Sequence, residues 1–176
     1  MYNFIFYGIV GSGKGTQVKL LDEYLKAKTG QETVLVSTGN VYRKITSEEG
    51  YTGTLIKKVM DAGGLMPDYI TNGVFASILL KEMTPEKNII ADGYPRSVGQ
   101  SVAFDEAIKF YSRGEVMVVY IKLSKEEATK RMKLRARADD TDEGIAQRFH
   151  EYETNVLPSL EFFRGKEGYT IHEING

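Results

Sequence analysis

A nine-residue stretch near the N-terminus combines glycines with a lysine and a threonine at a spacing suited to binding phosphate. It reads Gly8-Ile-Val-Gly-Ser-Gly-Lys-Gly-Thr16, and it lies between an apolar run, residues 2–7, and a pattern of helical period. Glycines let the backbone wrap around an anion, so that its N–H groups and the start of the next helix face it. Lys14 adds a positive charge that can reach further along a phosphate chain. A turn that merely needs glycine would explain neither Lys14 nor Thr16, so we interpret the stretch as a phosphate-binding loop.

Two other polar segments follow apolar runs that resemble strands. In Asp92-Gly-Tyr-Pro-Arg96, a carboxylate at the end of a strand can hold the water shell of Mg²⁺ beside phosphates. In Ser37-Thr-Gly-Asn-Val-Tyr-Arg43, an arginine in the first turns of a helix can bind a second phosphate through two hydrogen bonds. Taken alone, the first segment is equally well a polar turn, and the second a capped helix with a solvated arginine. Together with the phosphate-binding loop, both favour the phosphate-binding interpretation.

A cluster of arginines lies in the second half of the chain. Arg131 and Arg135 are four residues apart and share a helix face, and Arg137 and Arg148 follow. The run 130–137 is also compatible with a nucleic-acid patch or with a solvated charged face. The carboxylates that come directly afterwards, at positions 139 and 140, favour arginines held in place by acidic partners.

Composition narrows the class of protein. The chain has 176 residues, which is the size of one domain, and a net charge of −1 from 23 basic and 24 acidic residues. The balance gives no argument for nucleic-acid or membrane binding. The chain has no cysteine, so disulfides and thiolate zinc sites are excluded. We expect no signal peptide and no membrane span, and a cytoplasmic location fits this composition.

Short apolar runs alternate with helical patterns, which predicts a doubly wound α/β fold with a parallel sheet. The expected strands cover residues 2–7, 33–37, 88–92, 115–123 and 169–174. The expected helices cover residues 14–28, 39–47, 54–61 and 69–82, a stretch from residue 124, and a long stretch from 141 to just before Pro158. Three helices between residues 37 and 88 exceed a simple crossover, so we expect a helical insertion that stands over the strand ends.

The ordered motifs resemble those of adenylate kinases in the nucleoside monophosphate kinase family. The segments that show this resemblance are Gly8–Gln17, Ser37–Arg43, Met60–Gly63, Asp92–Gln100 and Arg137–Arg148. The resemblance implies a P-loop kinase fold, a five-stranded parallel sheet of order 2-3-1-4-5 with a helical insertion that binds the nucleoside monophosphate and a minimal lid. It further implies one domain, 1–176, with core segments 1–37, 68–130 and 142–176, the insertion at 38–67 and the lid at 131–141.

The resemblance also implies the reaction, a reversible transfer of the γ-phosphoryl group of Mg·ATP to AMP that gives two ADP. The implied ATP-binding residues are Gly11, Ser12, Gly13, Lys14, Gly15, Thr16, Arg131 and Arg135. Mg²⁺ would be held by Thr16 and, through water, by Asp92. The implied AMP-binding residues are Thr38, Arg43, Gly64, Leu65, Met66, Gly93, Tyr94, Pro95, Arg96, Gln100, Arg137 and Arg148. The implied catalytic residues are Lys14, Arg96, Arg135, Arg137, Asp139 and Arg148.

The sequence departs from the family pattern at several positions. Val10 and Tyr94 replace the usual proline and phenylalanine, Asn40 replaces an aspartate, and Gly64 stands where many members have lysine. Only Ala136 separates Arg135 from Arg137, so the expected lid is close to minimal and carries no zinc. The sequence ends at Gly176, where family members continue with a loop and a helix. On this basis we expect poorer contacts to the ATP base.

Three alternatives accompany the adenylate kinase hypothesis. A UMP/CMP kinase is disfavoured by Thr38 and Gln100, because the related pyrimidine kinases carry alanine and asparagine there. A nucleotide-binding module of low turnover would fit Asn40 and the short lid, but it would have little need for so many arginines. Nucleic-acid binding through residues 130–137 is the third. The resemblance implies a monomer whose partners are ATP and AMP, with neither nucleic acid nor membrane.

Overall fold

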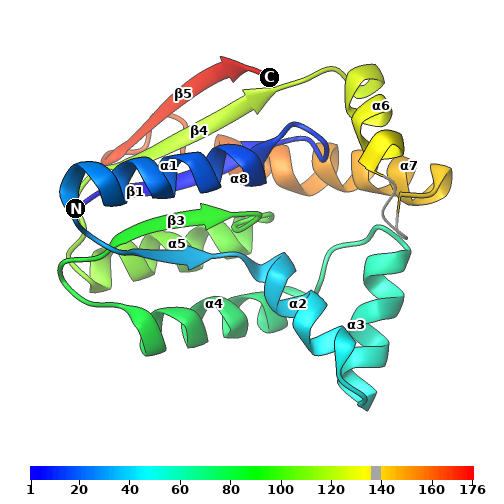
Figure 1. Cartoon of the computed structure of the whole chain (residues 1–176), viewed down its shortest axis with the longest axis horizontal. Helices are drawn as coiled ribbons and strands as arrows, with labels where there is room; N and C mark the ends of the chain where they lie inside the picture. The colour runs from blue at the N-terminus through cyan, green and yellow to red at the C-terminus, as the bar shows by residue number, and fades with distance from the viewer. Residues whose placement is uncertain (136–139) are drawn as a thin grey trace.

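Five parallel strands form one sheet at the centre of the molecule, in the order β2-β3-β1-β4-β5. The computed structural model describes residues 1–135 and 140–176 (Figure 1). The strands are β1 (Asn3–Gly8), β2 (Thr33–Val36), β3 (Asn88–Asp92), β4 (Val116–Lys122) and β5 (Tyr169–Asn175). This arrangement confirms the predicted fold class and strand order. It also brings the carboxyl ends of all five strands to one edge of the sheet, where open α/β sheets bind their ligands.

The central strand explains the apolar run at the start of the sequence. Every residue of β1 is buried, because β1 lies between β3 and β4 and helices cover both of its faces. In register, Phe4 is paired with Ile90 on one side and Met117 on the other. The strand therefore ends at Gly8 in a buried position, and the phosphate-binding loop begins from the middle of the sheet.

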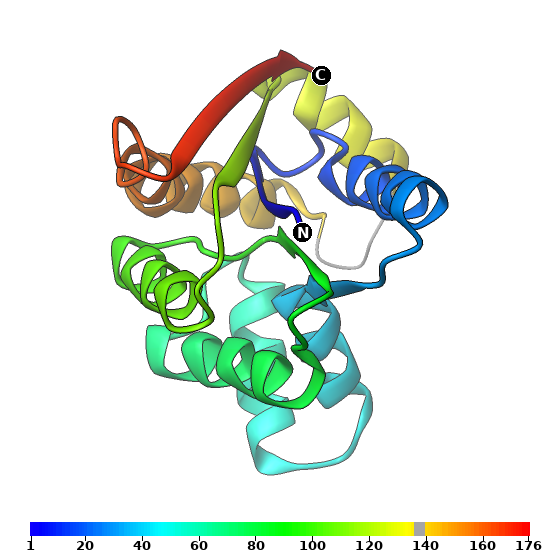
Figure 2. The same ribbon diagram turned by 90° about the vertical axis from the view of Figure 1, so that its left-hand side faces the viewer.

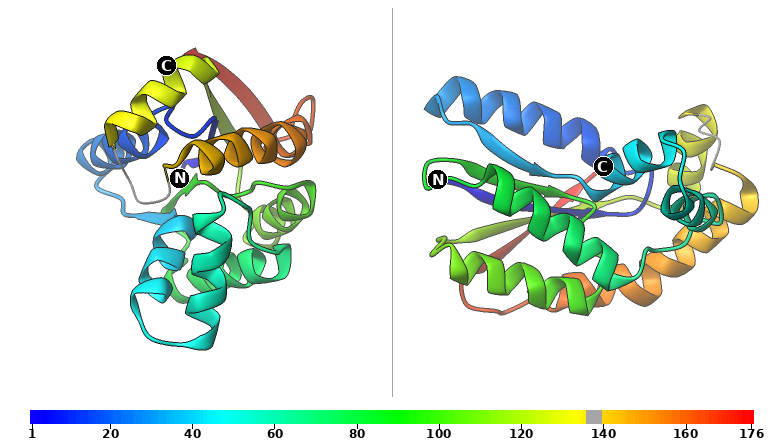
Figure 3. Two further views of the ribbon diagram at one scale, coloured as in Figure 1. Left: turned by 90° about the vertical axis from the view of Figure 1, so that its right-hand side faces the viewer. Right: turned by 90° about the horizontal axis from the view of Figure 1, so that it is seen from below.

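Helices lie on both faces of the sheet and at its carboxyl edge, as the right-hand view of Figure 3 shows. The helices are α1 (Lys14–Thr29), α2 (Thr38–Ser47), α3 (Tyr51–Asp61), α4 (Asp68–Glu82), α5 (Val98–Phe110), α6 (Lys125–Arg135), α7 (Asp142–Glu151), the π-helical turn η1 (Tyr152–Val156) and α8 (Leu157–Glu161). Helix α1 covers one face, and α4, α5 and α8 cover the other. The short helices α2 and α3 extend away from the sheet, at the bottom of Figure 2.

Two helix predictions need correction. Helix α5 was not predicted, because its first turn follows a proline-containing turn and its apolar residues form no regular stripe. The long helix expected to end before Pro158 instead continues to Glu161. The backbone widens into the π-helical turn just before the proline, and the N–H of Leu157 donates to the carbonyl of Tyr152, five residues back. The wider turn accommodates the proline ring, which would otherwise clash with the carbonyl four residues earlier.

An aromatic cluster fills the larger half of the core, between the sheet and helices α4, α5 and α8. The ring of Phe75 stacks on Tyr94 with centroids 4.4 Å apart, and Phe104 lies 5.8 Å from Phe75 and 6.3 Å from Phe163. The Tyr94 hydroxyl donates to Asn72 Oδ1 at 2.9 Å. This bond gives the tyrosine a polar partner inside an apolar cluster, which explains how the chain tolerates tyrosine there.

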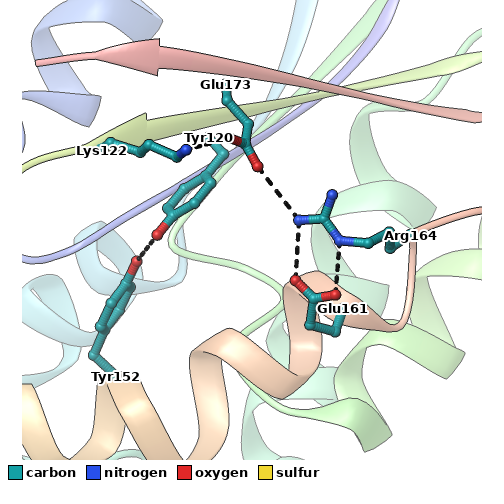
Figure 4. A network of polar contacts seen from close by, with 6 residues as sticks. All are labelled: Tyr120, Lys122, Tyr152, Glu161, Arg164 and Glu173. Atoms are coloured by element: carbon teal, nitrogen blue, oxygen red, sulfur yellow. Dashed lines mark hydrogen bonds and ion pairs between the residues drawn. The ribbon is translucent and has the colours of Figure 1, made fainter.

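Polar contacts connect the edge strand β5 to the rest of the fold (Figure 4). Arg164 donates to Glu161 at 2.7 and 3.0 Å and to Glu173 on β5 at 3.4 Å, while Lys122 on β4 pairs with Glu173. Lys122 first, and then Arg164, hold the pKa of the Glu173 carboxyl below its usual range. Because these groups are exposed to solvent, their ion pairs contribute little to stability, and β5 depends mainly on its pairing with β4.

None of the helices formed by the described residues is long and apolar enough to cross a membrane.

The aromatic cluster provides a test of the packing. Phe104→Ala is expected to lower the free energy of unfolding by about 3–5 kcal/mol, because the side chain is fully buried among other rings. Phe110→Ala, on the same helix but with the ring 80% exposed, should cost less than about 1 kcal/mol. Urea unfolding followed by circular dichroism measures both. Similar losses for the two variants would contradict this account of the core.

Candidate functional site

The loop between β1 and α1 has the geometry of an anion site. Gly11 and Gly13 have positive φ angles of 84° and 90°, so the chain turns tightly from the strand into the helix. Among the described residues, no side chain caps the N-terminus of α1 and no acidic residue lies in its first turn. The positive end of the helix dipole is therefore open to an anion that enters the loop.

Lys14 lies at the centre of the site. Its Nζ donates to the carbonyls of Gly8 at 2.6 Å and Ile9 at 3.1 Å, so the side chain folds back over the loop. Burial lowers the pKa of Lys14 to about 8, and the nearby Asp92 carboxylate opposes this shift, while Arg96 and Arg135 add to it. An incoming phosphate would supply the negative charge that this ammonium group lacks.

Asp92 ends β3 beside the loop and is the candidate for holding a metal. A Cβ atom built on Gly15 would lie 3.7 Å from Asp92 Oδ2, so the carboxylate faces the start of α1. In the described part of the chain, no group of three or more His, Cys, Asp or Glu residues could enclose a metal ion. One carboxylate next to a phosphate loop fits Mg²⁺, which keeps several waters and binds through few protein ligands plus substrate phosphates.

Arg96 is positioned by the turn that follows Asp92. Its Nε donates to the carbonyl of Gly93 at 2.8 Å. Gly93 has a φ of 70°, and a Cβ there would lie 2.5 Å from Arg96 Nη2, so only glycine leaves room for the guanidinium group. Burial lowers the pKa of Arg96 and Asp92 opposes the shift, so the arginine remains charged.

The start of α2 contributes two polar side chains to the same region. Thr38 is buried, and its Oγ1 donates to the carbonyl of Gly93 at 3.3 Å, which connects α2 to the turn that positions Arg96. Arg43 donates from Nη2 to Asn40 Oδ1 at 2.7 Å. Asn40, which departs from the family pattern, therefore orients Arg43 through a neutral hydrogen bond.

On the opposite side, Asp140 holds two arginines together. Arg135 donates to both carboxylate oxygens, at 3.1 and 2.8 Å, and Arg148 Nη1 donates to Oδ1 at 2.9 Å. The Asp140 side chain is only 1% exposed, so this charge is desolvated and stabilises both guanidinium groups. Two further predicted residues, Arg137 and Asp139, lie outside the described residues.

Most of these side chains line one cavity, although Asp92 and Asp140 are not among its lining residues. Of the residues predicted from the sequence, it is lined by Lys14, Thr38, Arg43, Gly64, Leu65, Met66, Gly93, Pro95, Arg96, Gln100, Arg135 and Arg148. Tyr94 lies instead in the aromatic cluster, with no exposed surface. Arg131 lies away from this cavity and donates to Glu127 on its own helix at 3.1 Å.

Several lining residues were not predicted from the sequence. They are Tyr42, Met60, Gly63, Thr71, Glu151 and Tyr152, among others. Glu151 and Tyr152 follow Arg148 by three and four residues, so helical spacing placed them on the same face and could have signalled them. Tyr42 gave no such signal. Its hydroxyl donates to Thr71 on α4 at 2.8 Å, a contact between segments distant in the sequence.

The two sides of the cavity approach each other at one point. A Cβ on Gly63, at the end of α3, would lie 2.5 Å from the backbone oxygen of Gly144 in α7. The insertion that carries α2 and α3 therefore touches the helix that carries Arg148. This contact lies beside the cavity, which Gly63 and Arg148 both line.

A five-stranded parallel sheet in this order, with a glycine-rich loop and Lys14 after its first strand, defines an α/β protein of the P-loop kinase class. A family model described as "Adenylate kinase" matches residues 6–168. The adenylate kinase of Leptospira biflexa is 35% identical over 180 residues, covering 100% of this chain and 92% of that protein. The adenylate kinase of Oenococcus oeni is 31% identical over 175 residues, covering 99% and 90%. That of Mycobacterium ulcerans is 36% identical over 159 residues, covering 90% and 84%. The chain belongs to the adenylate kinase family, as its motifs predicted.

The Asp140 cluster allows a direct test of its role. Asp140→Ala is expected to lower the free energy of unfolding by about 1–3 kcal/mol, because Arg135 and Arg148 would lose a desolvated partner. Asp61→Ala is the control, because Asp61 and its partner Lys57 are both more than half exposed, and should cost less than about 0.5 kcal/mol. Denaturant titration compares the variants. An Asp140→Ala protein as stable as the control would contradict a structural role for this carboxylate.

Proposed function

We propose that the protein transfers the γ-phosphoryl group of Mg·ATP to AMP reversibly, giving two ADP. One observation carries the proposal. Five cationic side chains from five helices or turns, Lys14, Arg43, Arg96, Arg135 and Arg148, line a single cavity. Phosphoryl transfer requires mainly that two phosphate groups be aligned and that their charge be neutralised, which such a ring of cations accomplishes.

The ATP phosphates bind in the loop of residues 11–16 under this proposal, with Lys14 released from the carbonyls of Gly8 and Ile9. The open N-terminus of α1 and the glycine conformations support this assignment. When bound, Mg²⁺ neutralises charge on the ATP phosphates, with Asp92 and Thr16 as the residues that would hold it. Arg131 would contact the ATP base only after exchanging its bond to Glu127.

AMP binds on the other side of the cavity, with its phosphate between Arg43 and Arg96. The bonds that orient these guanidinium groups, to Asn40 and to the Gly93 carbonyl, leave other N–H groups for the phosphate. The base lies against residues 64–66 and the Gln100 amide. Thr38 and Gln100 favour adenine over a pyrimidine, as the resemblance to the family implies.

Transfer itself takes place between the two phosphates as the lid side closes. Arg135 and Arg148, held by Asp140, line the same cavity as Arg96, and Arg137 would join them. Closure excludes water, which strengthens each charge interaction and prevents loss of the phosphoryl group to water. We further propose the division predicted from the sequence, with the insertion at 38–67 and the lid at 131–141.

The proposal is tested by offering the purified protein Mg·ATP with AMP, CMP or UMP and measuring nucleotide products by chromatography. We expect ADP formation with AMP at a kcat/KM far above that with either pyrimidine nucleotide. A preference for CMP or UMP would favour a UMP/CMP kinase. Nucleotide binding without ADP formation would favour a module of low turnover.

Substitution of Arg96 tests whether the activity takes place in the cavity described above. Arg96→Ala should lower kcat/KM for AMP by more than tenfold, equivalent to about 1.4 kcal/mol, while the free energy of unfolding changes little. A smaller loss would mean that the acceptor phosphate binds elsewhere.

The lowered pKa of Lys14 predicts a pH dependence. The protonated ammonium group binds phosphate, so kcat/KM for ATP should fall as the pH rises through about 8. Over the same range the unfolded chain holds more protons at this lysine, because its pKa there is near 10.5. The contribution of Lys14 to stability therefore rises with pH while activity falls.

Lys14→Arg is the matched control, because a guanidinium group does not titrate in this range. Its kcat/KM, although lower, should be independent of pH between 7 and 9.5. A wild-type profile that stays flat to pH 10 would contradict the assignment of Lys14.

A further inference from the structure

The side-chain amide of Gln100 is fixed at both ends. Gln100 is 2% exposed, and it lines the cavity from the first turn of α5. Its Oε1 accepts a hydrogen bond from the backbone N–H of Arg96 at 2.8 Å. Its Nε2 donates to Asp68 Oδ1 at 2.7 Å. Each end of the amide therefore has a partner in the protein before any ligand binds.

The chemistry of these partners permits one orientation of the amide. A backbone N–H can only donate, and an ionised carboxylate can only accept. Turning the Gln100 amide by half a turn would oppose donor to donor at Arg96 and acceptor to acceptor at Asp68. One N–H of Nε2 and one lone pair of Oε1 are not used by these two bonds, and they form a donor–acceptor pair of fixed order.

Asp68 is itself held firmly in place. It is the first residue of α4, and both carboxylate oxygens lie 2.8 Å from Ser97 Oγ, the residue that caps α5. A Cβ on Gly99 would lie 2.6 Å from Asp68 Oδ2, so the absence of a side chain at Gly99 makes room for this carboxylate. Asp68 is not among the residues that line the cavity, whereas its partner Gln100 is, so Gln100 connects Asp68 to the cavity.

We propose that Asp68 is a positioning residue that sets the selectivity for the acceptor base by fixing the polarity of the Gln100 amide. The proposal rests on the proposed function, in which Gln100 faces the base of AMP. Adenine offers a ring nitrogen that accepts beside an amino group that donates. A 6-oxopurine, such as the base of IMP, has the reverse order, an N–H that donates beside a carbonyl that accepts. A fixed amide accommodates the first base and opposes the second, whereas an amide free to turn would accept both.

Two variants release the amide in different ways. Asp68→Asn has nearly the same shape, but its side chain can donate as well as accept, so it can pair with either end of the Gln100 amide and only the Arg96 N–H still selects an orientation. Gly99→Ala leaves Asp68 intact and displaces its carboxylate, because the new methyl group would lie only 2.6 Å from Oδ2. Gly73→Ala, in the middle of α4, is the matched control, since nothing lies within 4 Å of its Cβ position.

The experiment measures kcat and KM for AMP and for IMP with Mg·ATP, and the affinity for both nucleotides by calorimetry. In wild type we expect a preference for AMP. In Asp68→Asn and Gly99→Ala, the ratio of kcat/KM for AMP to kcat/KM for IMP should fall by about tenfold, the equivalent of one hydrogen bond. We expect this change mainly in KM and in affinity. The kcat for AMP should change less than about threefold, and Gly73→Ala should keep the wild-type ratio.

The outcomes separate this proposal from the proposed function. If wild type forms ADP from AMP and both variants keep its AMP-to-IMP ratio within about twofold, Asp68 does not set selectivity, and the kinase function stands. If wild type forms no ADP, the proposed function fails, and the calorimetric ratio still decides whether Asp68 fixes the base preference. A wild type that binds AMP and IMP equally would overturn the inference. A purely structural defect would lower kcat for both nucleotides and leave their ratio unchanged.

Discussion

The whole arrangement depends on keeping several positive charges close together in a partly buried cavity. Burial disfavours each charge, and the charges repel one another, as the lowered pKa values of Lys14 and Arg96 reflect. The fold offsets this cost locally. Asp140 binds two arginines on one side, Asp92 faces the loop on the other, and carbonyl groups of Gly8 and Gly93 accept from Lys14 and Arg96. The cationic side chains that line the described part of the cavity outnumber the acidic ones, so the cavity retains a strong attraction for anionic groups.

The parallel sheet makes this concentration of charge possible. Strands β1 and β3 are neighbours, so the loop after Gly8 and the turn after Asp92 emerge side by side, although more than 80 residues separate them. The aromatic cluster beneath β1 and β3 keeps the two strand ends in a fixed relation, with Tyr94 contributing a ring to that cluster directly before the turn that bears Arg96. The rigid core thus determines where the central cations lie, while α2, α3 and α7 carry the outer ones.

Much of this could be predicted from the sequence, and the failures have physical causes. Continuous apolar runs predicted all five strands, and ordered motifs predicted the family. Helix α5 was not predicted because its buried face carries polar residues that break the apolar period, namely Gln100, Ser101 and Asp105. The helix continues past Pro158 because of a π-helical turn, and no local sequence pattern predicts that turn. Tyr42 and Asp68 act through contacts with distant segments, and such pairings cannot be deduced from spacing in one sequence.

The contact between Gly63 and Gly144 has a consequence for the pace of turnover. Gly63 has no side chain to pack against α7, where its neighbours include the Gly144 backbone and Arg148 Cγ, so this residue loses little dispersion energy when the two segments separate. A contact of this kind resists opening only weakly. Departing nucleotides would be delayed by the arginines that hold their phosphates, and hardly at all by the protein surfaces that enclose them.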